Sequence, residues 1–442
     1  MSVTRIVPAD VLTPIGAYAA LAQPRASCLL ESVESGGRIS RYSFIGLDYR
    51  AVRDFDSGRE LYDEVRAFID AHRSECDDEG LGGALLAFAY DAARGDARLP
   101  ARESSPPAMP AAYVAVPATW LIFDHFTDCL TIWCSGGDST ACERRIAGYV
   151  ERLLAARPAM PGTLRARGKM SASLDRDEYL RLVGLVKRHI YEGDVYQLQL
   201  GIRFGAELEG SAFDLYRALR RENPSPYMFF VDTPFGQLLG ASPEFLVRLE
   251  GRKARLRPLA GTRWRGRDDD EDARIATELL ANEKERAEHV MLVDLGRNDL
   301  GAVCEYGSVQ VDELLQIERY SHVMHIVSNV VGRLRPECDA LDLFRAGFPA
   351  GTVTGTPKAR AMQLIDGLEP VTRGFYAGSI GRWSFGGDFD SCITLRSVHV
   401  RDGRAWWQAS AGIVADSEPV AEYEEVFHKT RIARAVLGID NP

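Results

Sequence analysis

The sequence predicts an α+β fold, and the pattern typical of this class is read from about residue 172 onward. Three observations lead to this prediction. Apolar residues recur at helical spacing over 176–194, short apolar runs follow one another over 227–259, and Asp402-Gly403 separates two strand-like runs within 391–414. Helical spacing indicates an amphipathic helix. An Asp-Gly pair between two such runs is a strong hairpin signal.

The elements follow in chain order. Residues 1–165 mix short apolar runs with a proline-rich stretch at 97–117, and we expect an N-terminal regulatory or structural region there. A linker at 155–173 precedes a catalytic domain over 172–437. Its first predicted helix, 176–194, stops at Gly193. The further predicted strands lie at 227–232, 236–241, 244–250 and 253–259, and the further helices at 269–282, 283–300 and 356–367.

Composition indicates a globular protein of the cytoplasm. The chain has 442 residues, of which 46% are hydrophobic and 26% charged, so it can bury a large core. We expect no membrane partner, because no apolar run approaches the length of a membrane span and the N-terminus lacks the pattern of a signal peptide. A net charge of −10 argues against nucleic acid as a partner. The eight cysteines show no metal-ligand spacing and are expected to be free thiols in a reducing compartment.

Two acidic pairs predict a metal site. Glu285 and Glu288 are three residues apart, and Glu422 and Glu425 repeat this spacing before Lys429. On helices these side chains share one face. An acidic pair alone is more commonly a solvated helix face. Four carboxylates from two helices can converge on one ion, and Mg²⁺ fits because it prefers oxygen ligands and keeps waters and substrate oxygens in its shell.

Eight further segments point to one family by their order and spacing. The chain resembles the chorismate-utilising enzymes, most closely the large (component I) subunits of anthranilate synthase, over about 25–50 and 175–437. The resemblance implies large mixed or antiparallel sheets packed as a sandwich and flanked by helices. The segments are NPSPYMFF (223–230), GASPEFLVR (240–248), PLAGTRWRG (258–266), KERAEH (284–289), YSHVMHIVSNVVG (320–332), FPAGTVTGTPKARAMQLID (348–366), FYAGSIG (375–381) and ASAGIVADSEP (409–419).

The resemblance also implies roles for individual residues. Glu288 and Glu425 would contact Mg²⁺, while Glu285 and Glu422 would hold its waters or brace the direct ligands. Glu244 would protonate the C4 hydroxyl of chorismate as it leaves, which requires a raised pKa. The substrate itself would be met by a larger set of residues. That set is Tyr376 and Arg396 at the enolpyruvyl carboxylate, the backbone of Gly412 at the same anion, and Gly261, Thr262, Thr352 and Lys429 at other substrate-lining positions.

Two positions distinguish the family's reactions. Gln197 stands where the water-using relatives carry a lysine, and an amide cannot act as a base toward water. Ala260 stands where 4-amino-4-deoxychorismate synthases often carry an attacking lysine. Together they imply that ammonia attacks C2 directly. His325 and Thr352 match positions associated with pyruvate elimination in anthranilate-forming relatives.

The released product stays open at this point. Two alternatives remain, 2-amino-2-deoxyisochorismate synthase and component I of 4-amino-4-deoxychorismate synthase. The chain departs from the family's usual residues at Trp264, Thr356 and His428, which border the substrate region.

The resemblance implies two partners besides chorismate. No cysteine lies in a glutaminase-type nucleophile elbow, so ammonia is expected from a separate glutamine amidotransferase subunit. LLES at 29–32 resembles the tryptophan-binding motif of feedback-inhibited subunits, with a second wall from NPSPYMF. The candidate inhibitor contacts are Glu31, Ser32, Pro226, Tyr227 and Met228. Taken without the family resemblance, the LLES segment is typical of a core strand with a polar edge.

Two readings from other classes are weaker. GTVTGTPK (351–358) resembles a phosphate loop, as in a nucleotide-binding regulator. It lacks the spacing of such a loop, and Pro357 would remove a backbone donor. A catalytically inactive chorismate-binding subunit is disfavoured because the metal set and Glu244 are all present.

Overall fold

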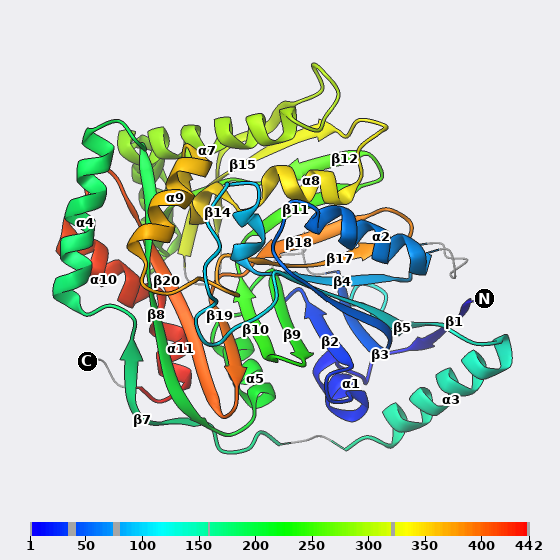
Figure 1. Ribbon diagram of the computed structural model, residues 1–442. Helices are drawn as coiled ribbons and strands as arrows, with labels where there is room; N and C mark the ends of the chain where they lie inside the picture. The colour runs from blue at the N-terminus through cyan, green and yellow to red at the C-terminus, as the bar shows by residue number, and fades with distance from the viewer. Residues whose placement is uncertain (1, 34–40, 74–79, 158–159, 320–322, 440–442) are drawn as a thin grey trace.

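The computed structural model describes residues 2–33, 41–73, 80–157, 160–319 and 323–439. Cys76 and the first three residues of the 320–332 segment lie outside these residues. The helices are α1 Pro14–Leu21, α2 Leu61–Arg73, α3 Ser139–Ala155, α4 Arg176–Tyr191, α5 Ala212–Glu222, α6 Asp269–Ala281, α7 Glu283–Gly301, α8 Ala340–Gly347, α9 Lys358–Leu368, α10 Pro419–Lys429 and α11 Arg431–Val436, with 3-10 turns η1 Tyr90–Arg94 and η2 Gly351–Val353 (Figure 1). No helix among the described residues is long and apolar enough to span a membrane.

The strands are interspersed with these helices along the chain, in places as runs of consecutive strands such as β9 to β13 and β17 to β20. They are β1 Ser2–Pro8, β2 Ser27–Glu31, β3 Tyr42–Phe55, β4 Gly83–Phe88, β5 Ala112–Asp124, β6 Cys129–Ser135, β7 Arg165–Ala172, β8 Gln197–Glu209, β9 Tyr227–Thr233, β10 Gly236–Ser242, β11 Phe245–Glu250, β12 Lys253–Leu256, β13 Leu259–Trp264, β14 Gln310–Arg319, β15 Val323–Arg333, β16 Gly355–Thr356, β17 Ser379–Ser384, β18 Phe389–Ile393, β19 Ser397–Arg401 and β20 Arg404–Ile413.

The strand pairings between described residues are all antiparallel, and they form two arms that meet at β5. One arm runs β5-β3-β2-β9-β10-β19-β20-β8. The other runs β5-β4-β17-β18-β11-β12-β15, and β13 and β14 also pair with β15. Each arm therefore begins with strands from the first part of the chain and continues with strands from the second part.

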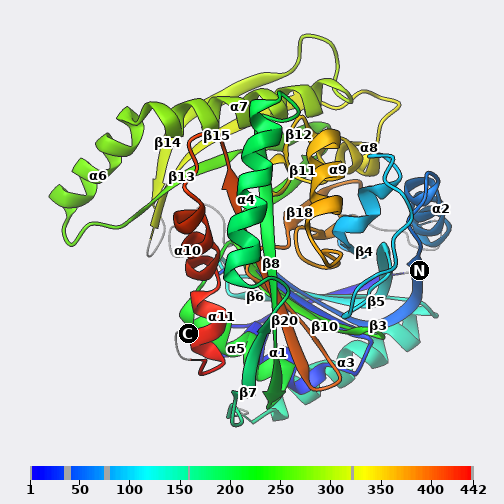
Figure 2. The ribbon, with the colours of Figure 1, turned by 60° about the vertical axis from the view of Figure 1, so that its left-hand side comes forward.

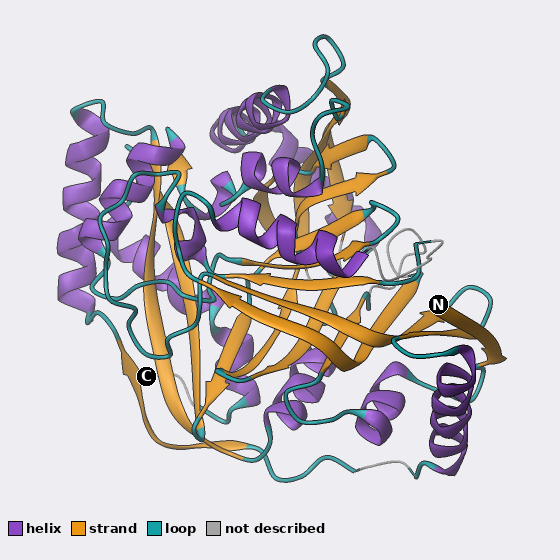
Figure 3. Cartoon of the chain, turned by 45° about the vertical axis from the view of Figure 1, so that its right-hand side comes forward, coloured by secondary structure: helices purple, strands orange, loops and turns teal. Residues whose placement is uncertain are grey.

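The arms pack face to face and carry helices on their outer sides (Figure 3). The side chains of β9, which alternate between the two faces of the sheet, show this arrangement. Phe229 and Val231 point into the core between the arms, whereas Met228 and Phe230 point into a second core under α1, α3, α4 and α5. Successive strand residues face opposite sides of a sheet, so one strand serves both cores. The predicted α+β sandwich of antiparallel sheets flanked by helices is confirmed.

Local signals account for the elements that position the site. Asp175 caps α4 by accepting a hydrogen bond from the backbone N–H of Glu178, and Asn282 caps α7 through the N–H of Glu285. Asp402 and Gly403 both have positive φ angles, 50° and 73°, as a two-residue hairpin turn between β19 and β20 requires. Figure 2 shows α4 and α10 beside the long strands β8 and β20, where the C-terminal acidic pair lies.

Candidate active site

The two acidic pairs lie on α7 and α10 and affect each other electrostatically. Burial raises the pKa of Glu288, and the negative charges of Glu285 and, more weakly, Glu425 raise it further. Burial also raises the pKa of Glu422, while a hydrogen bond from Ser417 opposes this and the Glu425 charge adds to it. Carboxylates from two helices distant in sequence are thus close enough for the charge of Glu425 to raise the pKa of Glu288.

Basic side chains hold two of these four carboxylates. Arg263 lies 3.0 Å from Glu285, and the Lys429 ammonium lies 2.7 Å from Glu425. The four glutamates do not bring three ligand oxygens within 4.8 Å of one another. Among the described residues, the trio His189, Glu192 and Asp194 at the end of α4 meets that spacing, and there Arg360 also binds Asp194.

The chemistry of the four glutamates nevertheless fits a hard cation. All their donor atoms are carboxylate oxygens, the ligands that Mg²⁺ prefers. Glu288 and Glu422 are pushed toward the protonated state by burial and by neighbouring carboxylates. A divalent cation placed between the helices would relieve that repulsion.

Glu244 is a buried carboxyl group that hydrogen-bonds a single hydroxyl. It lies between β10 and β11 and is 8% exposed. Burial raises its pKa from 4.5 to about 8, which the hydrogen bond from Thr352 only partly opposes. The Thr352 hydroxyl donates at 3.3 Å to one carboxyl oxygen of Glu244. Glu244 is therefore protonated at neutral pH, as a general acid must be.

Gln197 faces α7 from the start of β8. Its Nε2 donates to a Glu288 oxygen at 2.9 Å. A carboxylate only accepts hydrogen bonds, so the amide oxygen must point the other way. That oxygen is buried and has no hydrogen-bond partner within the described protein. Gly412 lies against the same amide, because a Cβ built there would be 2.9 Å from the Nε2 atoms of Gln197 and Gln199.

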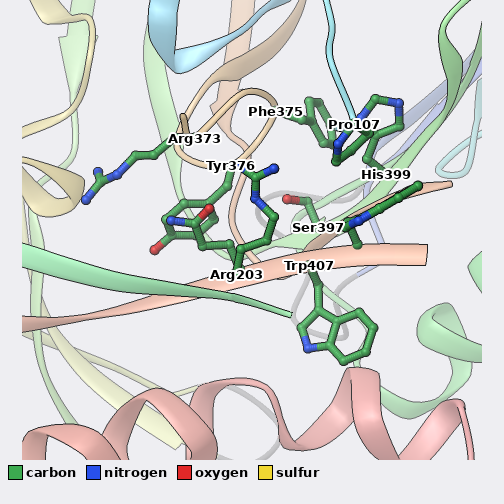
Figure 4. Close-up of a pocket in the computed structure, with 10 residues that line it drawn as sticks. Pro107, Arg203, Arg373, Phe375, Tyr376, Ser397, His399 and Trp407 are labelled. Atoms are coloured by element: carbon green, nitrogen blue, oxygen red, sulfur yellow. The ribbon is translucent and has the colours of Figure 1, made fainter. Parts of the chain in front are cut away.

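A chain of polar contacts joins Tyr376 to Lys429. The Tyr376 hydroxyl and the Ser410 hydroxyl are 2.8 Å apart, and Ser410 donates to the Gln199 amide oxygen at 2.8 Å. Lys429 donates to the Ser410 carbonyl at 2.9 Å. Behind Tyr376 lies a cavity of about 20 Å³ that Arg203 and His399 also line (Figure 4). Tyr376 is thus held at its hydroxyl by Ser410, and the Arg373 guanidinium lies 5.8 Å from the centroid of its ring.

Strands β13 and β15 bring Gly261, Thr262 and His325 together. Thr262 is opposite His325 in the register, and the Gly261 carbonyl accepts a hydrogen bond from His325 Nδ1 at 3.0 Å. Burial lowers the pKa of His325 to about 4, so its ring is neutral at physiological pH. Arg396 lowers that pKa further and therefore lies near the same ring. Gly261 has φ of +63°, a conformation that favours glycine.

The five candidate inhibitor contacts line one cavity of about 340 Å³. Strands β2 and β9 are paired there, with Glu31 opposite Met228. The Glu31 carboxylate itself is held from α5, by the Tyr216 hydroxyl at 2.6 Å and by Arg220 at 3.0 Å. The far wall comes from β11 and β18. It includes Asp390, which binds the Tyr227 hydroxyl at 2.8 Å, and Cys392.

Strand β18, which forms part of this far wall, also contacts the backbone of Glu244. The backbone N–H of Ile393, the residue after Cys392, donates to the Glu244 carbonyl at 3.1 Å. Strand β18 therefore contributes to the cavity and supports the backbone of the buried acid.

Ser410 and Gln199 were missed by sequence reasoning, although both lie within this polar network. Ser410 precedes Gly412 by two residues, which places both on one face of β20. The spacing of two residues from Gly412 is the signal by which Ser410 could have been predicted. Gln199 has the same relation to Gln197 on β8.

Comparison with known proteins agrees with the resemblance to the chorismate-utilising enzymes. A family model described as chorismate binding enzyme matches residues 26–435. The chain is 42% identical to anthranilate synthase component 1 of Thermus thermophilus, covering 96% of this chain and 95% of that protein. It is 39% identical to aminodeoxychorismate synthase component 1 of Bacillus subtilis, over 93% and 91% of the two chains. The crystal structure of anthranilate synthase component I from Streptococcus pneumoniae aligns with a TM-score of 0.81 at 34% identity, over 98% and 99%.

Proposed function

The chain belongs to the family of chorismate binding enzymes, and from that membership we propose that it is an anthranilate synthase component 1. It converts chorismate and ammonia to anthranilate and pyruvate through 2-amino-2-deoxyisochorismate. The observation that carries this proposal is the pairing of a buried, protonated Glu244 with a glutamine, rather than a base, at position 197. Its relatives named anthranilate synthase component 1 support the same assignment.

Glu244 acts as the general acid of the first step. Hydroxide is a poor leaving group, so the C4 hydroxyl of chorismate must receive a proton as it departs. With a pKa raised to about 8 by burial, Glu244 carries that proton at neutral pH. The Thr352 hydroxyl orients the carboxyl group.

Gln197 selects ammonia as the nucleophile. Its amide cannot deprotonate a water molecule, whereas its unpartnered buried oxygen can accept a hydrogen bond from an N–H of ammonia. Such a contact would hold the nitrogen with its lone pair directed away from Gln197 and toward the substrate ring.

A magnesium ion would complete the site. Glu288 and Glu425 would bind the ion directly, and Glu285 and Glu422 would hold its waters. When bound, Mg²⁺ would meet the ring carboxylate of chorismate and withdraw electron density as the nucleophile adds. Lys429, which pairs with Glu425 and donates to the Ser410 carbonyl, would be positioned by these contacts to meet the substrate.

The remaining residues bind the side chain and the ring. Tyr376 and Arg396 would hold the enolpyruvyl carboxylate, where the arginine fork suits a carboxylate. The backbone of Gly412 would meet the same anion. His325 would stay neutral beside the ring during pyruvate elimination, because burial lowers its pKa to about 4.

A second candidate function is component I of aminodeoxychorismate synthase, since one relative at 39% identity bears that name. Ala260 argues against it because a methyl group cannot attack C2 as the lysine of such enzymes does. Release of 2-amino-2-deoxyisochorismate is the other alternative, and it differs only in omitting pyruvate elimination.

The proposed function implies a partner subunit and an inhibitor. A separate glutamine amidotransferase, component II, would supply ammonia. Tryptophan would inhibit by occupying the cavity between β2, β9, β11 and β18, where arginine and aspartate side chains can meet the two charged ends of an amino acid. The protein would work in the cytoplasm in tryptophan biosynthesis.

One experiment tests the function. Purified protein is mixed with chorismate, Mg²⁺ and a high concentration of ammonium salt at mildly alkaline pH, and the products are identified by chromatography. Anthranilate and pyruvate should form in equal amounts without the partner, and glutamine should replace ammonia only once the partner is added. Aminodeoxychorismate without pyruvate, or isochorismate without ammonia, would contradict the assignment.

A further inference from the structure

Arg373 and Glu369 form an ion pair inside the protein. The Arg373 side chain is 1% exposed and the Glu369 side chain 2%. The guanidinium meets the carboxylate as a fork, with Nε 3.0 Å from one oxygen and Nη2 2.7 Å from the other. Burial lowers the pKa of Arg373, but the Glu369 charge more than offsets this, so the guanidinium stays charged.

A buried ion pair of this kind adds little to stability by itself. Two charges lose their hydration on burial, and apolar residues of similar volume in their place are often as stable. What the pair does supply is direction, because a guanidinium fork and a carboxylate bind their partners at fixed angles. The role of the pair is therefore expected in the elements that it joins.

Arg373 joins two elements of the site. Its Nη1 donates to the Val353 carbonyl at 2.5 Å, and its Nη2 donates to the Gln199 carbonyl at 2.9 Å. Val353 follows Thr352, whose hydroxyl donates to the Glu244 carboxyl group. One guanidinium thus sets the distance between the turn η2, which orients the acid, and strand β8.

Glu369 extends this contact to a second point on β8 and to β20. Its Oε1 accepts a hydrogen bond from the Gly201 backbone N–H at 2.8 Å, and its Oε2 accepts one from the Gln408 amide at 3.3 Å. A Cβ built at Gly201 would be 3.1 Å from Glu369 Oε1 and 2.8 Å from Gln408 Nε2. The absence of a side chain at Gly201 therefore permits the carboxylate to approach the strand.

The pair also reaches the residue expected to bind the enolpyruvyl carboxylate, Tyr376. Arg373 and Tyr376 come from the same loop before β17, and the guanidinium lies 5.8 Å from the centroid of the ring (Figure 4). Gln199, whose carbonyl Arg373 holds, accepts a hydrogen bond from Ser410 through its amide oxygen. Ser410 in turn contacts the Tyr376 hydroxyl. Both ends of the substrate site are thus attached to one guanidinium.

We propose that Arg373 and Glu369 are a positioning pair, which holds the turn of Thr352 and the Tyr376 ring at a fixed separation. This inference rests on the proposed function. In that function chorismate presents its C4 hydroxyl to Glu244 and its enolpyruvyl carboxylate to Tyr376. A change in the separation would move the hydroxyl away from the proton of the acid. The pair acts through these neighbours rather than on chorismate itself.

Two variants test the pair. Arg373→Lys keeps a positive charge beside Glu369, but an ammonium lacks the planar fork that holds the Val353 and Gln199 carbonyls at the same time. The double variant Arg373→Met with Glu369→Leu removes both charges, which avoids leaving one of them buried and unpaired.

Arg94 and Asp366 provide matched controls. They form another largely buried ion pair, at 2.8 Å, and Asp366 belongs to α9, the helix that Glu369 follows. Arg94 also donates to Asp91 and to the Pro100 carbonyl, which lie in η1 and just after it. Arg94→Lys, and the double variant Arg94→Met with Asp366→Leu, therefore disturb a comparable pair outside the substrate site.

Each variant is assayed for loss of chorismate with Mg²⁺ and ammonium salt, over a pH range centred on about 8, the pKa of Glu244. Arg373→Lys should lower kcat about tenfold to a hundredfold, because a misplacement of about 1 Å is enough for such a loss. It should also raise the KM for chorismate. The Arg94 controls should change neither quantity.

The pH profile separates positioning from stability. The hydrogen bond from Thr352 lowers the pKa of Glu244, so its loss should move the alkaline fall in activity to higher pH. The charged groups that line the cavity beside Glu244, Arg257 and Asp299, are the same in every variant. A smaller folded fraction would instead lower the rate by the same factor at every pH.

Melting temperatures complete the test. The double variant at Arg373 and Glu369 should melt close to its Arg94 counterpart, yet lose activity as Arg373→Lys does. Kinetics and a pH profile like those of the Arg94 controls would overturn the proposal. So would failure of both Arg373 variants to fold while the Arg94 controls fold, because the pair would then serve stability alone. Failure of the unmodified protein to form anthranilate from ammonia would instead overturn the proposed function.

Discussion

Glu244→Gln should lower activity and raise stability at alkaline pH. Glutamine has nearly the shape of glutamate but cannot give a proton to the leaving hydroxyl. General acid catalysis typically contributes about a hundredfold to ten-thousandfold, so kcat should fall by at least about a hundredfold. In the unmodified protein, activity should fall as the pH rises through about 8, because Glu244 then loses its proton.

The stability effect follows from the raised pKa. Below pH 4.5 the carboxyl group is neutral in both the folded and the unfolded chain, so it does not affect folding. As the pH rises, the unfolded chain ionises first, and folding becomes less favourable until the folded pKa of about 8 is passed. At about 1.4 kcal/mol for each pKa unit, the full penalty above pH 8 is roughly 5 kcal/mol. Glu244→Gln removes that penalty.

The assay compares thermal unfolding and turnover at pH 5 and pH 9. The variant should unfold at a temperature close to that of the unmodified protein at pH 5, and several degrees higher at pH 9. Glu278→Gln, an exposed change on α6, is the control and should alter neither quantity. Turnover near that of the unmodified protein, or no gain in stability at pH 9, would refute the assignment of Glu244 as a buried general acid.

Three further changes test other parts of the site. Glu288→Gln or Glu425→Gln should abolish turnover, because each removes an anionic ligand and several kcal/mol of charge stabilisation; near-normal rates with an unchanged Mg²⁺ titration in both would exclude this metal site. Ser32→Ala or Met228→Thr should weaken inhibition by tryptophan and leave uninhibited activity largely intact, as inhibition curves would show. If millimolar tryptophan neither inhibits the unmodified protein nor raises its melting temperature, the cavity does not bind it. Gly412→Ala should lower kcat/KM by about tenfold to a hundredfold, since a Cβ 2.9 Å from two amides displaces Gln197 and Gln199; unchanged kinetics would show that the backbone there does not meet the substrate.

Much of the fold could be predicted because its signals are local. The hairpin at Asp402 and Gly403 follows from two residues that accept positive φ. The predicted boundary between helices at 282 and 283 coincides with Asn282, which ends α6 and caps α7. Gly193, with φ of +81°, follows the end of α4.

Other contacts depend on register and on which face a residue takes. Nothing local to Glu31 indicates that Tyr216 and Arg220, almost two hundred residues away, bind its carboxylate. The same holds for the Lys358–Asp299 pair, which forms only when α9 packs near α7. Ser410 looks like an ordinary polar strand residue until β8 and β20 are aligned, with Gly412 opposite Gln199. Long-range pairing decides these contacts, and a single sequence does not contain it.

The double role of β18 has an evolutionary consequence if tryptophan occupies the cavity. Asp390 and Cys392 face the cavity, and the next residue, Ile393, supports the Glu244 backbone. A mutation on β18 that weakens binding of the inhibitor would also disturb Glu244. The organism would then escape feedback inhibition only with a lower rate of product formation. Strand β2 does not have this second role of supporting Glu244. Variants selected for tryptophan overproduction should therefore accumulate on the LLES side of the cavity and be rare on β18.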